Sequence, residues 1–457
     1  MLTEHGLPVF LNPDVDAEAP LVIIYSPVSS ARLQYTCEFI FNQVLKARFA
    51  LTKDLIEFQN SHAIRINYSS GKISHSVQII PHVILFESGV SEPTPLPRLK
   101  NGLLYFFENA FNQEPPAFHF DLFASVFYFI SRYEEWQNFE KDSHQRFEAR
   151  SSLLFKNGFH LKPVVDLWIL EFKNHLQNLY RVQFPVLPFK VVSSIDVDNL
   201  FAYRHKGILR SAGGGIKDLL RGDFKSAWQR VSVLTGKAED PFDMYSKISD
   251  FCSTHHIPLV YFFLFRTGTR YDRTVDPRSP AFKKVVSLVK RKGSLAGLHP
   301  SYDSAFQPSL LQEEVKKFSE VLGASVNLSR QHFLRFDIRS TPAHLLENGI
   351  TTDFSMGFAS SPGFRAGTAH PFFYYDLLKE AKSELLFVPF CAMDGAYLIY
   401  DQVQPADALT SMLDLCSEVK KTGGVFMTIF HERTFSDHLY PGFATLYKNL
   451  HLAVKEL

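Results

Sequence analysis

The sequence predicts an α/β protein in two parts, a smaller N-terminal α/β domain over residues 1–185 and a larger domain over residues 186–457. Three observations support this. Strand and helix candidates alternate along the second part, 46% of residues are apolar and 21% are charged, and 457 residues suit two domains better than one. The division falls at Gln183–Pro188, where Pro185 and Pro188 disfavour continuation of a helix.

The N-terminal part contains apolar runs and helical spacings that predict a small α/β unit. Leu122, Val126, Phe129 and Tyr133 recur at helical spacing in a strongly aromatic stretch. The predicted strands are Leu21–Tyr25, Ala63–Tyr68 and Val77–Phe86, and the predicted helices are residues 31–48, 121–136 and 164–176.

The second part alternates strands and helices in the pattern of a parallel sheet with crossover helices, either a barrel or a doubly wound layer. The predicted strands are residues 189–195, 259–265, 295–298, 333–336, 386–393 and 425–430. The predicted helices are residues 242–255, 281–291, 310–322, 341–347 and 405–421. Gly213–Gly215 are not followed by a phosphate-binding Lys-Ser/Thr pair, so we expect a flexible loop there.

Acidic and imidazole side chains stand at four of the six predicted strand ends: Asp196 with Asp198, His299, Asp394 and His431. Residues i and i+2 of a strand share a face, so Asp196 and Asp198 can converge on one ion or one water. Taken alone, this pair would more simply be an Asp/Asn turn after a strand. Because the carboxyl ends of parallel strands gather the chemistry of such folds, the whole set favours a functional site.

Composition excludes several other classes of protein. The net charge of +1 gives no electrostatic footprint for nucleic acid or anionic lipid. The four cysteines are scattered without a Cys-x-x-Cys pair, so neither a zinc knot nor a disulfide framework is expected. The N-terminus lacks the basic start and apolar core of a secretory signal, and no apolar run approaches the length of a transmembrane helix. We therefore expect a cytoplasmic protein.

Four short motifs of the second part resemble those of the NodB-type polysaccharide deacetylases, carbohydrate esterase family 4. They are Ser194–Asp198, with one residue inserted between the acids, and His299–Asp303, Arg330–Phe333 and Ile429–His431. A divergent bacterial branch with an extra N-terminal domain is similar also in Gly363–Thr368, Met393-Asp394, Ser131–Glu135 and Arg146-Phe147. The resemblance covers about residues 189–435.

This resemblance implies a distorted (β/α) barrel of the polysaccharide deacetylase type that holds one divalent transition metal ion, usually zinc. The implied reaction removes an acetyl group from an N-acetylated carbohydrate. Asp198 and His299 would bind the metal, Asp196 would be the general base and His431 the general acid. The resemblance also implies two supporting roles, in which Asp394 orients His431 and an arginine, Arg330 or Arg365, pairs with Asp196.

The third metal ligand is open, because Asp303 stands where the family has its second histidine. His332 is our candidate, since a transition ion favours imidazole and His332 lies beside the next predicted strand. Asp303 is the alternative, because residues i and i+4 meet on a helical turn and carboxylates also bind zinc. A third possibility is a site with only two ligands and no catalysis.

The leading hypothesis is therefore a metal-dependent carbohydrate N-deacetylase that acts on a soluble or lipid-linked glycan precursor. The alternative is a non-catalytic glycan-binding or assembly protein on a degenerate deacetylase barrel. The two differ in metal content, because the enzyme needs a complete metal site.

Overall fold

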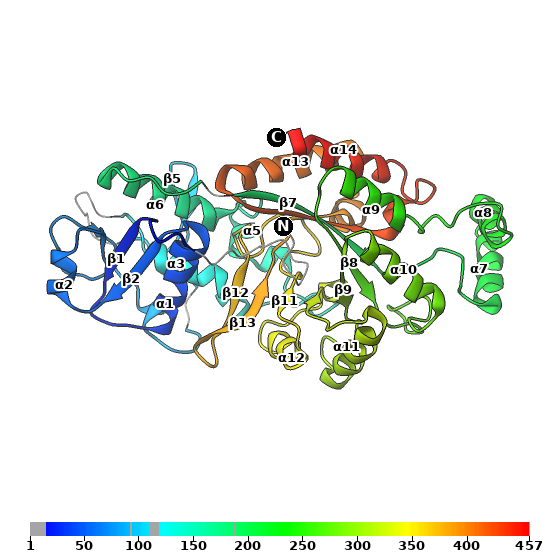
Figure 1. The fold of residues 1–457 in the computed structure, drawn as a ribbon, viewed down its shortest axis with the longest axis horizontal. Coiled ribbons are helices and arrows are strands. Elements are labelled where there is room, and N and C mark those ends of the chain that lie inside the picture. Colours follow the sequence, from blue (N-terminus) through cyan, green and yellow to red (C-terminus); the bar gives the residue numbers. More distant parts are fainter. Residues whose placement is uncertain (1–14, 92–93, 110–117, 187, 457) are drawn as a thin grey trace.

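The computed structural model describes residues 15–91, 94–109, 118–186 and 188–456 (Figure 1). Residues 1–14 of the predicted N-terminal domain and residue 187 of the predicted division lie outside this part. The chain forms a mixed α/β structure with two main sheets, one of nine strands and one of four.

The nine-stranded sheet has the order β12-β13-β11-β10-β9-β8-β7-β15-β14. All neighbouring strands are parallel except β12, which runs antiparallel to β13. The strands are β7 (Phe189–Val197), β8 (Leu259–Leu264), β9 (Leu295–His299), β10 (Leu328–Ser329), β11 (Thr352–Asp353), β12 (Phe372–Asp376), β13 (Ala381–Phe387), β14 (Ala392–Met393) and β15 (Gly424–His431). In the described residues the outer strands β12 and β14 do not pair with each other, so the sheet curls without closing into a full barrel.

Both faces of this sheet are covered, which explains its continuous apolar strands. All residues of β8 and β15 are buried, as expected for strands of a parallel sheet with both faces packed. The helices that pack around it are α9 (Tyr245–Thr254), α10 (Pro280–Arg291), α11 (Pro308–Leu322), α12 (Thr341–Glu347), α13 (Pro405–Thr422) and α14 (Phe443–Glu456). On the other face, Val192, Val260, Phe262, Met427 and Ile429 belong to a separate apolar cluster.

The four-stranded sheet is parallel, with the order β2-β1-β3-β4 (Figure 1, blue). Its strands are β1 (Leu21–Tyr25), β2 (Arg48–Thr52), β3 (Ile64–Asn67) and β4 (Val77–Gln78). The accompanying elements are α1 (Ala31–Cys37), the π-helix η1 (Glu38–Val44), α2 (Leu55–Asn60), α3 (Leu122–Ile130), α4 (Tyr133–Trp136), α5 (Leu153–Lys156), α6 (Val164–Tyr180) and the hairpin β5 (Arg98–Lys100) and β6 (Leu103–Tyr105).

Buried polar contacts join the N-terminal elements to the nine-stranded part. The Arg32 guanidinium, buried on α1, lies 2.6 Å from Glu380 Oε1 in the turn between β12 and β13. On α6, Asp166 accepts hydrogen bonds from Thr368 Oγ1 (2.5 Å) and Ala369 N (2.8 Å). The division into two domains at residue 185 stays a prediction.

Three predicted strands differ from the structure. The expected strand 333–336 is instead a turn that contains the 3₁₀-helix η4 (His332–Leu334), because Phe333 and Leu334 have φ angles of 59° and 52°, outside the range of a strand. The expected strand 386–393 divides into the end of β13 and the whole of β14, with residues 388–391 between them outside any strand. The expected strand 77–86 ends at Gln78 and is followed by the 3₁₀-helix η2 (Val83–Leu85).

The predicted loop at Gly213–Gly215 is also wrong, because these glycines lie inside α7 (Ile208–Leu220). This helix and α8 (Phe224–Leu234) form a hairpin at the right edge of Figure 1, which contacts the rest of the chain through Ser226 and His438. Among the described residues, no helix is both long enough and apolar enough to span a lipid bilayer.

Candidate active site

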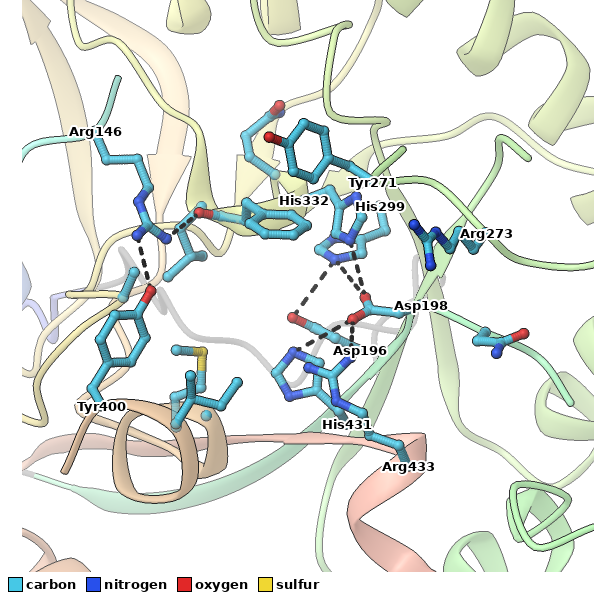
Figure 2. A pocket seen from close by; sticks show the side chains of 18 of the residues that line it. Arg146, Asp196, Asp198, Tyr271, Arg273, His299, His332, Tyr400, His431 and Arg433 are labelled. Carbon is cyan, nitrogen blue, oxygen red and sulfur yellow. Dashed lines mark hydrogen bonds and ion pairs between the residues drawn. The ribbon is translucent and has the colours of Figure 1, made fainter. Parts of the chain in front are cut away.

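Five polar residues converge where parallel strands end. Asp196 on β7 lies opposite His431 on β15, and Asp198 follows β7 directly. His299 is the last residue of β9, and Asp394 follows β14. Because these strands are parallel, their carboxyl ends lie along one edge of the sheet. Asp196, Asp198, His299 and His431 line a pocket of about 440 Å³ (Figure 2). Asp394 lies outside the lining and contacts His431 at 2.6 Å.

Asp198, His299 and His332 form a cluster with the composition of a transition-metal site. Asp198 Oδ1 lies 3.4 Å from His299 Nε2 and 3.5 Å from His332 Nε2, and the three candidate ligand atoms all lie within 4.8 Å of one another. Asp198 Oδ1 is buried and has no hydrogen-bond partner among the described residues. A buried carboxylate oxygen without a donor, facing two imidazole nitrogens, fits a divalent transition ion.

Each imidazole of this cluster is oriented by a second contact at its other nitrogen. His299 Nδ1 lies 2.5 Å from the carbonyl oxygen of Arg330, and His332 Nδ1 lies 2.9 Å from Asp272 Oδ1. Since these acceptors favour a proton on Nδ1, each Nε2 is left with a lone pair directed at the ligand cluster. Asp272 lies in the segment after β8, and no sequence motif singles it out.

The second oxygen of Asp198 is held by Arg433. Arg433 Nη1 donates to Asp198 Oδ2 at 2.8 Å, and the Asp198 backbone N donates to Glu432 Oε2 at 3.0 Å. Burial alone would raise the pKa of the Asp198 carboxyl, but the surrounding imidazoles and Arg433 hold this pKa well below its usual range. Asp198 is therefore ionised, with one oxygen fixed by Arg433 and the other facing the imidazoles.

Asp196 forms a buried ion pair with Arg330. Arg330 Nη1 donates to Asp196 Oδ1 at 2.7 Å and to Ser194 Oγ at 2.8 Å. The guanidinium lies 4.4 Å above the Phe262 ring. That ring lies directly over Gly297 of β9, where a Cβ atom would meet it at 2.7 Å. With Oδ1 held by Arg330, Asp196 Oδ2 faces the cluster of candidate metal ligands and lies 3.9 Å from His299 Nε2.

Asp394 fixes His431 through two contacts. Its Oδ1 lies 2.6 Å from His431 Nδ1, and its Oδ2 accepts the His431 backbone N–H at 2.7 Å. Burial alone would lower the pKa of His431, but the adjacent Asp394 carboxylate outweighs it and the pKa rises to about 9. His431 Nε2 lies 3.9 Å from Asp198 Oδ2 and lines the pocket.

Two residues considered in the sequence analysis lie elsewhere. The expectation that Arg365 could pair with Asp196 is wrong, because Arg365 binds both oxygens of Glu135 on α4, at 2.6 and 2.8 Å. Asp303 lies in a turn rather than on a helix, so its spacing from His299 does not bring the two together. Its half-exposed carboxylate lies 4.0 Å from Arg335, outside the metal cluster.

The pocket walls combine aromatic rings with an arginine of the N-terminal part. Tyr271, Phe333 and Tyr400 line the pocket (Figure 2). Arg146 donates to the Phe333 carbonyl oxygen at 2.9 Å and to the Tyr400 hydroxyl at 3.0 Å. Arg146 entered the sequence analysis only as part of a motif, and Tyr271 and Tyr400 carry no sequence signal that separates them from core aromatics.

Comparison with known proteins gives one match to a family and several distant structural neighbours. Residues 22–181 match a family described as "Family of unknown function (DUF7033)". No curated protein matches the sequence of this chain.

The structural neighbours include polysaccharide deacetylases at low identity. A protein assigned as a polysaccharide deacetylase from Mycobacterium smegmatis has 15% identity and a TM-score of 0.38, over 60% of this chain and 87% of that chain. A protein with the same assignment from Pseudomonas aeruginosa PAO1 has 10% identity and a TM-score of 0.36, over 58% and 85%. The family 4 carbohydrate esterase from Streptomyces lividans in complex with acetate has 7% identity and a TM-score of 0.28, over 58% and 91%. At these values, function has to be inferred from the geometry of the site.

Proposed function

We propose that this protein is a metal-dependent hydrolase that removes an N-acetyl group from a carbohydrate. The observation that carries the proposal is the Asp198, His299 and His332 cluster, with Asp196 and His431 lining the same pocket. One carboxylate and two imidazoles for the ion, a second carboxylate beside them and an imidazole fixed by its own acid are the groups that hydrolysis of an amide requires.

Each group has a role that follows from its contacts. A divalent transition ion, when bound by Asp198, His299 and His332, supplies Lewis-acid polarisation of the amide carbonyl and a lowered pKa for water. Asp196, paired with Arg330, accepts a proton from the attacking water as its oxygen bonds to the carbonyl carbon. His431, held by Asp394, donates a proton to the amide nitrogen as the C–N bond breaks. The products are acetate and a free amine.

A carbohydrate substrate is supported by the motifs that resemble the polysaccharide deacetylases and by the pocket walls. The rings of Tyr271, Phe333 and Tyr400 give the pocket flat apolar surfaces, against which the C–H faces of a sugar ring can pack. Arg146 comes from the N-terminal part of the chain, so this part would contribute to substrate selection.

The test is acetate release from a panel of N-acetylated amino sugars and their oligomers, after reconstitution with zinc, cobalt or nickel. We expect turnover by the parent protein and a loss of at least about a hundredfold in kcat for Asp196→Asn, which removes the base but leaves the three metal ligands. A protein that holds metal but releases no acetate from any member of the panel would contradict the proposal and favour a glycan-binding role.

A further inference from the structure

The hairpin of α7 and α8 exposes more large apolar side chains than any other segment among the described residues. On α7, Ile208, Leu209, Ile216, Leu219 and Leu220 are all exposed, Leu209 to 91% and Leu220 to 83%. At 3.6 residues per turn these positions fall on one side of the helix, whereas Arg210, Lys217 and Asp218 fall on the other. No residue of α7 is buried, so this apolar side is not covered by the rest of the chain.

The second helix continues the exposed apolar surface. Phe224, Trp228 and Val231 of α8 follow at helical spacing and are exposed, Phe224 to 69% and Trp228 to 71%. The other side of α8 is fixed to the protein by buried Val233 and by Ser226, whose Oγ lies 2.8 Å from His438 Nε2. The two helices are joined by the ion pair of Arg230 with Asp218, at 2.7 Å.

The same segment concentrates positive charge. Residues 204–237 contain eight Lys or Arg residues and two Asp residues, whereas the whole chain has a net charge of +1. Arg204 and Arg230 pair with acids. Within the described residues, no carboxylate lies in ion-pair distance of Lys217, Arg221 or Lys225. Anionic lipid was excluded above on the net charge of the whole chain. That value averages over the chain and does not show this local positive excess.

We propose that the α7–α8 hairpin binds the surface of an anionic lipid bilayer, with its apolar side in the interfacial region and its basic side chains among the headgroups. Exposed Trp, Phe, Leu and Ile on one side of a helix, with unpaired Lys and Arg beside them, are the features of an interfacial amphipathic helix. A purely apolar partner surface would not account for the basic excess, and an acidic one would not account for the apolar side.

The hairpin is also tied to the wall of the active-site pocket. Arg210 of α7 donates through Nη2 to the backbone carbonyl of Arg273 at 2.6 Å, and Arg273 lines the pocket. A hairpin seated on lipid therefore keeps this wall close to the bilayer. If the proposed deacetylation is correct, this placement suits a lipid-linked sugar; the membrane binding itself does not depend on that function.

The test uses the full chain and vesicles of phosphatidylcholine with or without about one-third phosphatidylglycerol. Trp228 is an internal reporter, because the other two tryptophans, Trp136 and Trp168, are buried. We expect co-sedimentation with anionic vesicles, a blue shift of tryptophan emission and quenching by brominated lipid. All three signals should weaken at high salt, since headgroup attraction is screened.

Two matched variants make the test specific. The triple variant Leu209→Ser, Leu220→Ser and Phe224→Ser keeps Trp228 and should weaken vesicle binding by at least about tenfold. The control is the double variant Ile56→Ser and Leu96→Ser, which changes two apolar side chains outside the hairpin that are 69% and 72% exposed. It should bind vesicles as the parent protein does. Equal melting temperatures for all three proteins would show that folding is intact.

Three results would overturn the proposal. The first is the absence of sedimentation and of an emission shift with anionic vesicles at low salt. The second is vesicle binding by the triple variant that equals binding by the parent protein. The third is a dimer in sedimentation velocity that the triple variant dissociates, without vesicle binding, which would assign the apolar side to a second copy of this chain.

Discussion

The two carboxylate oxygens of Asp198 have different surroundings, and this difference defines the candidate metal site at the scale of single residues. Oδ2 accepts from Arg433, while Oδ1 is buried, faces His299 and His332, and has no hydrogen-bond donor in the part of the chain that the structure describes. A buried carboxylate oxygen without a partner costs free energy, so the arrangement is explained most simply by a cation at that position.

Arg433 should act on metal affinity through Asp198. We expect Arg433→Leu to weaken metal binding about 10- to 100-fold, because partners that orient a ligand typically contribute that much. Metal affinity can be measured by competition with a chromophoric chelator. Arg273→Leu is the matched control, since Arg273 lines the same pocket without an ion pair to Asp198 among the described residues. Equal affinities for the two variants would contradict this role.

Arg330 should matter for folding stability as well as for catalysis. Arg330→Met leaves the Asp196 carboxylate buried without its partner, and we expect a loss of about 3–5 kcal/mol in the free energy of unfolding. Urea denaturation of the apoprotein measures this loss. Adding Asp196→Asn should recover much of it, because the unpaired charge is then removed. If the double variant were no more stable than Arg330→Met, the unpaired Asp196 charge would not be the cause of the lost stability.

The residues at strand ends were predictable, and so were Asp394 as the partner of His431 and an arginine as the partner of Asp196, whereas Asp272 and Arg433 were not. The position of Asp196, Asp198, His299 and His431 follows from alternation of strands and helices, which places strand ends together. Asp272 and Arg433 act only through contacts with His332 and Asp198 that depend on the folded chain. Arg365 looked equivalent to Arg330 in the sequence, and only the position of Glu135 separates them.

At the scale of elements, the segment after β10 shows why a strand prediction failed at a functional position. Phe333 and Leu334 are apolar and suit a strand, but their positive φ angles turn the chain at His332. Non-glycine residues with such angles cost free energy and occur where the surrounding structure fixes them. Here Arg146 holds the Phe333 carbonyl, and the turn places His332 in the pocket.

The contact of α6 with the segment before β12 should depend on pH. Burial raises the pKa of Asp166 to about 7 against the hydrogen bonds from Ala369 and Thr368, which favour the charged form. Folding therefore favours the protonated acid, and this contribution to stability is complete below the unfolded pKa and is lost as pH rises through about 7.

We expect Asp166→Asn, which cannot ionise, to gain stability relative to the parent protein as pH increases. The difference between about pH 5 and pH 8 should be on the order of 1 to a few kcal/mol. Thermal or urea unfolding of both proteins over this range measures it. Parallel stability curves for the two proteins would contradict the assignment.

At α7 a loop was predicted where the structure has a helix, whereas at residues 333–336 a strand was predicted where the structure has a turn. Three consecutive glycines lower helix propensity and suggest a loop, whereas the apolar spacing of Ile208, Leu209, Ile216, Leu219 and Leu220, on which no prediction was based, is that of an amphipathic helix. In the structure this spacing forms an apolar side of the helix that is exposed rather than packed against the protein.

At the scale of the whole molecule, the candidate site is assembled from both parts of the chain. The nine-stranded sheet brings the three candidate metal ligands, the proposed base and the proposed acid to one edge, and the N-terminal part adds Arg146 to the pocket. The parallel sheet was predictable from the alternation of elements. The open, curled form of the sheet was not, because closure depends on pairing between outer strands that no local pattern specifies.

The central claim is the metal site, and elemental analysis of the untagged protein tests it most directly. We predict about one zinc, cobalt, nickel or iron ion per chain in the parent protein after reconstitution, and little in Asp198→Ala or His299→Ala. Asp303→Ala is the matched control, since its carboxylate lies outside the cluster, and it should retain the metal. No metal in the parent protein, or equal metal in all four proteins, would contradict the account.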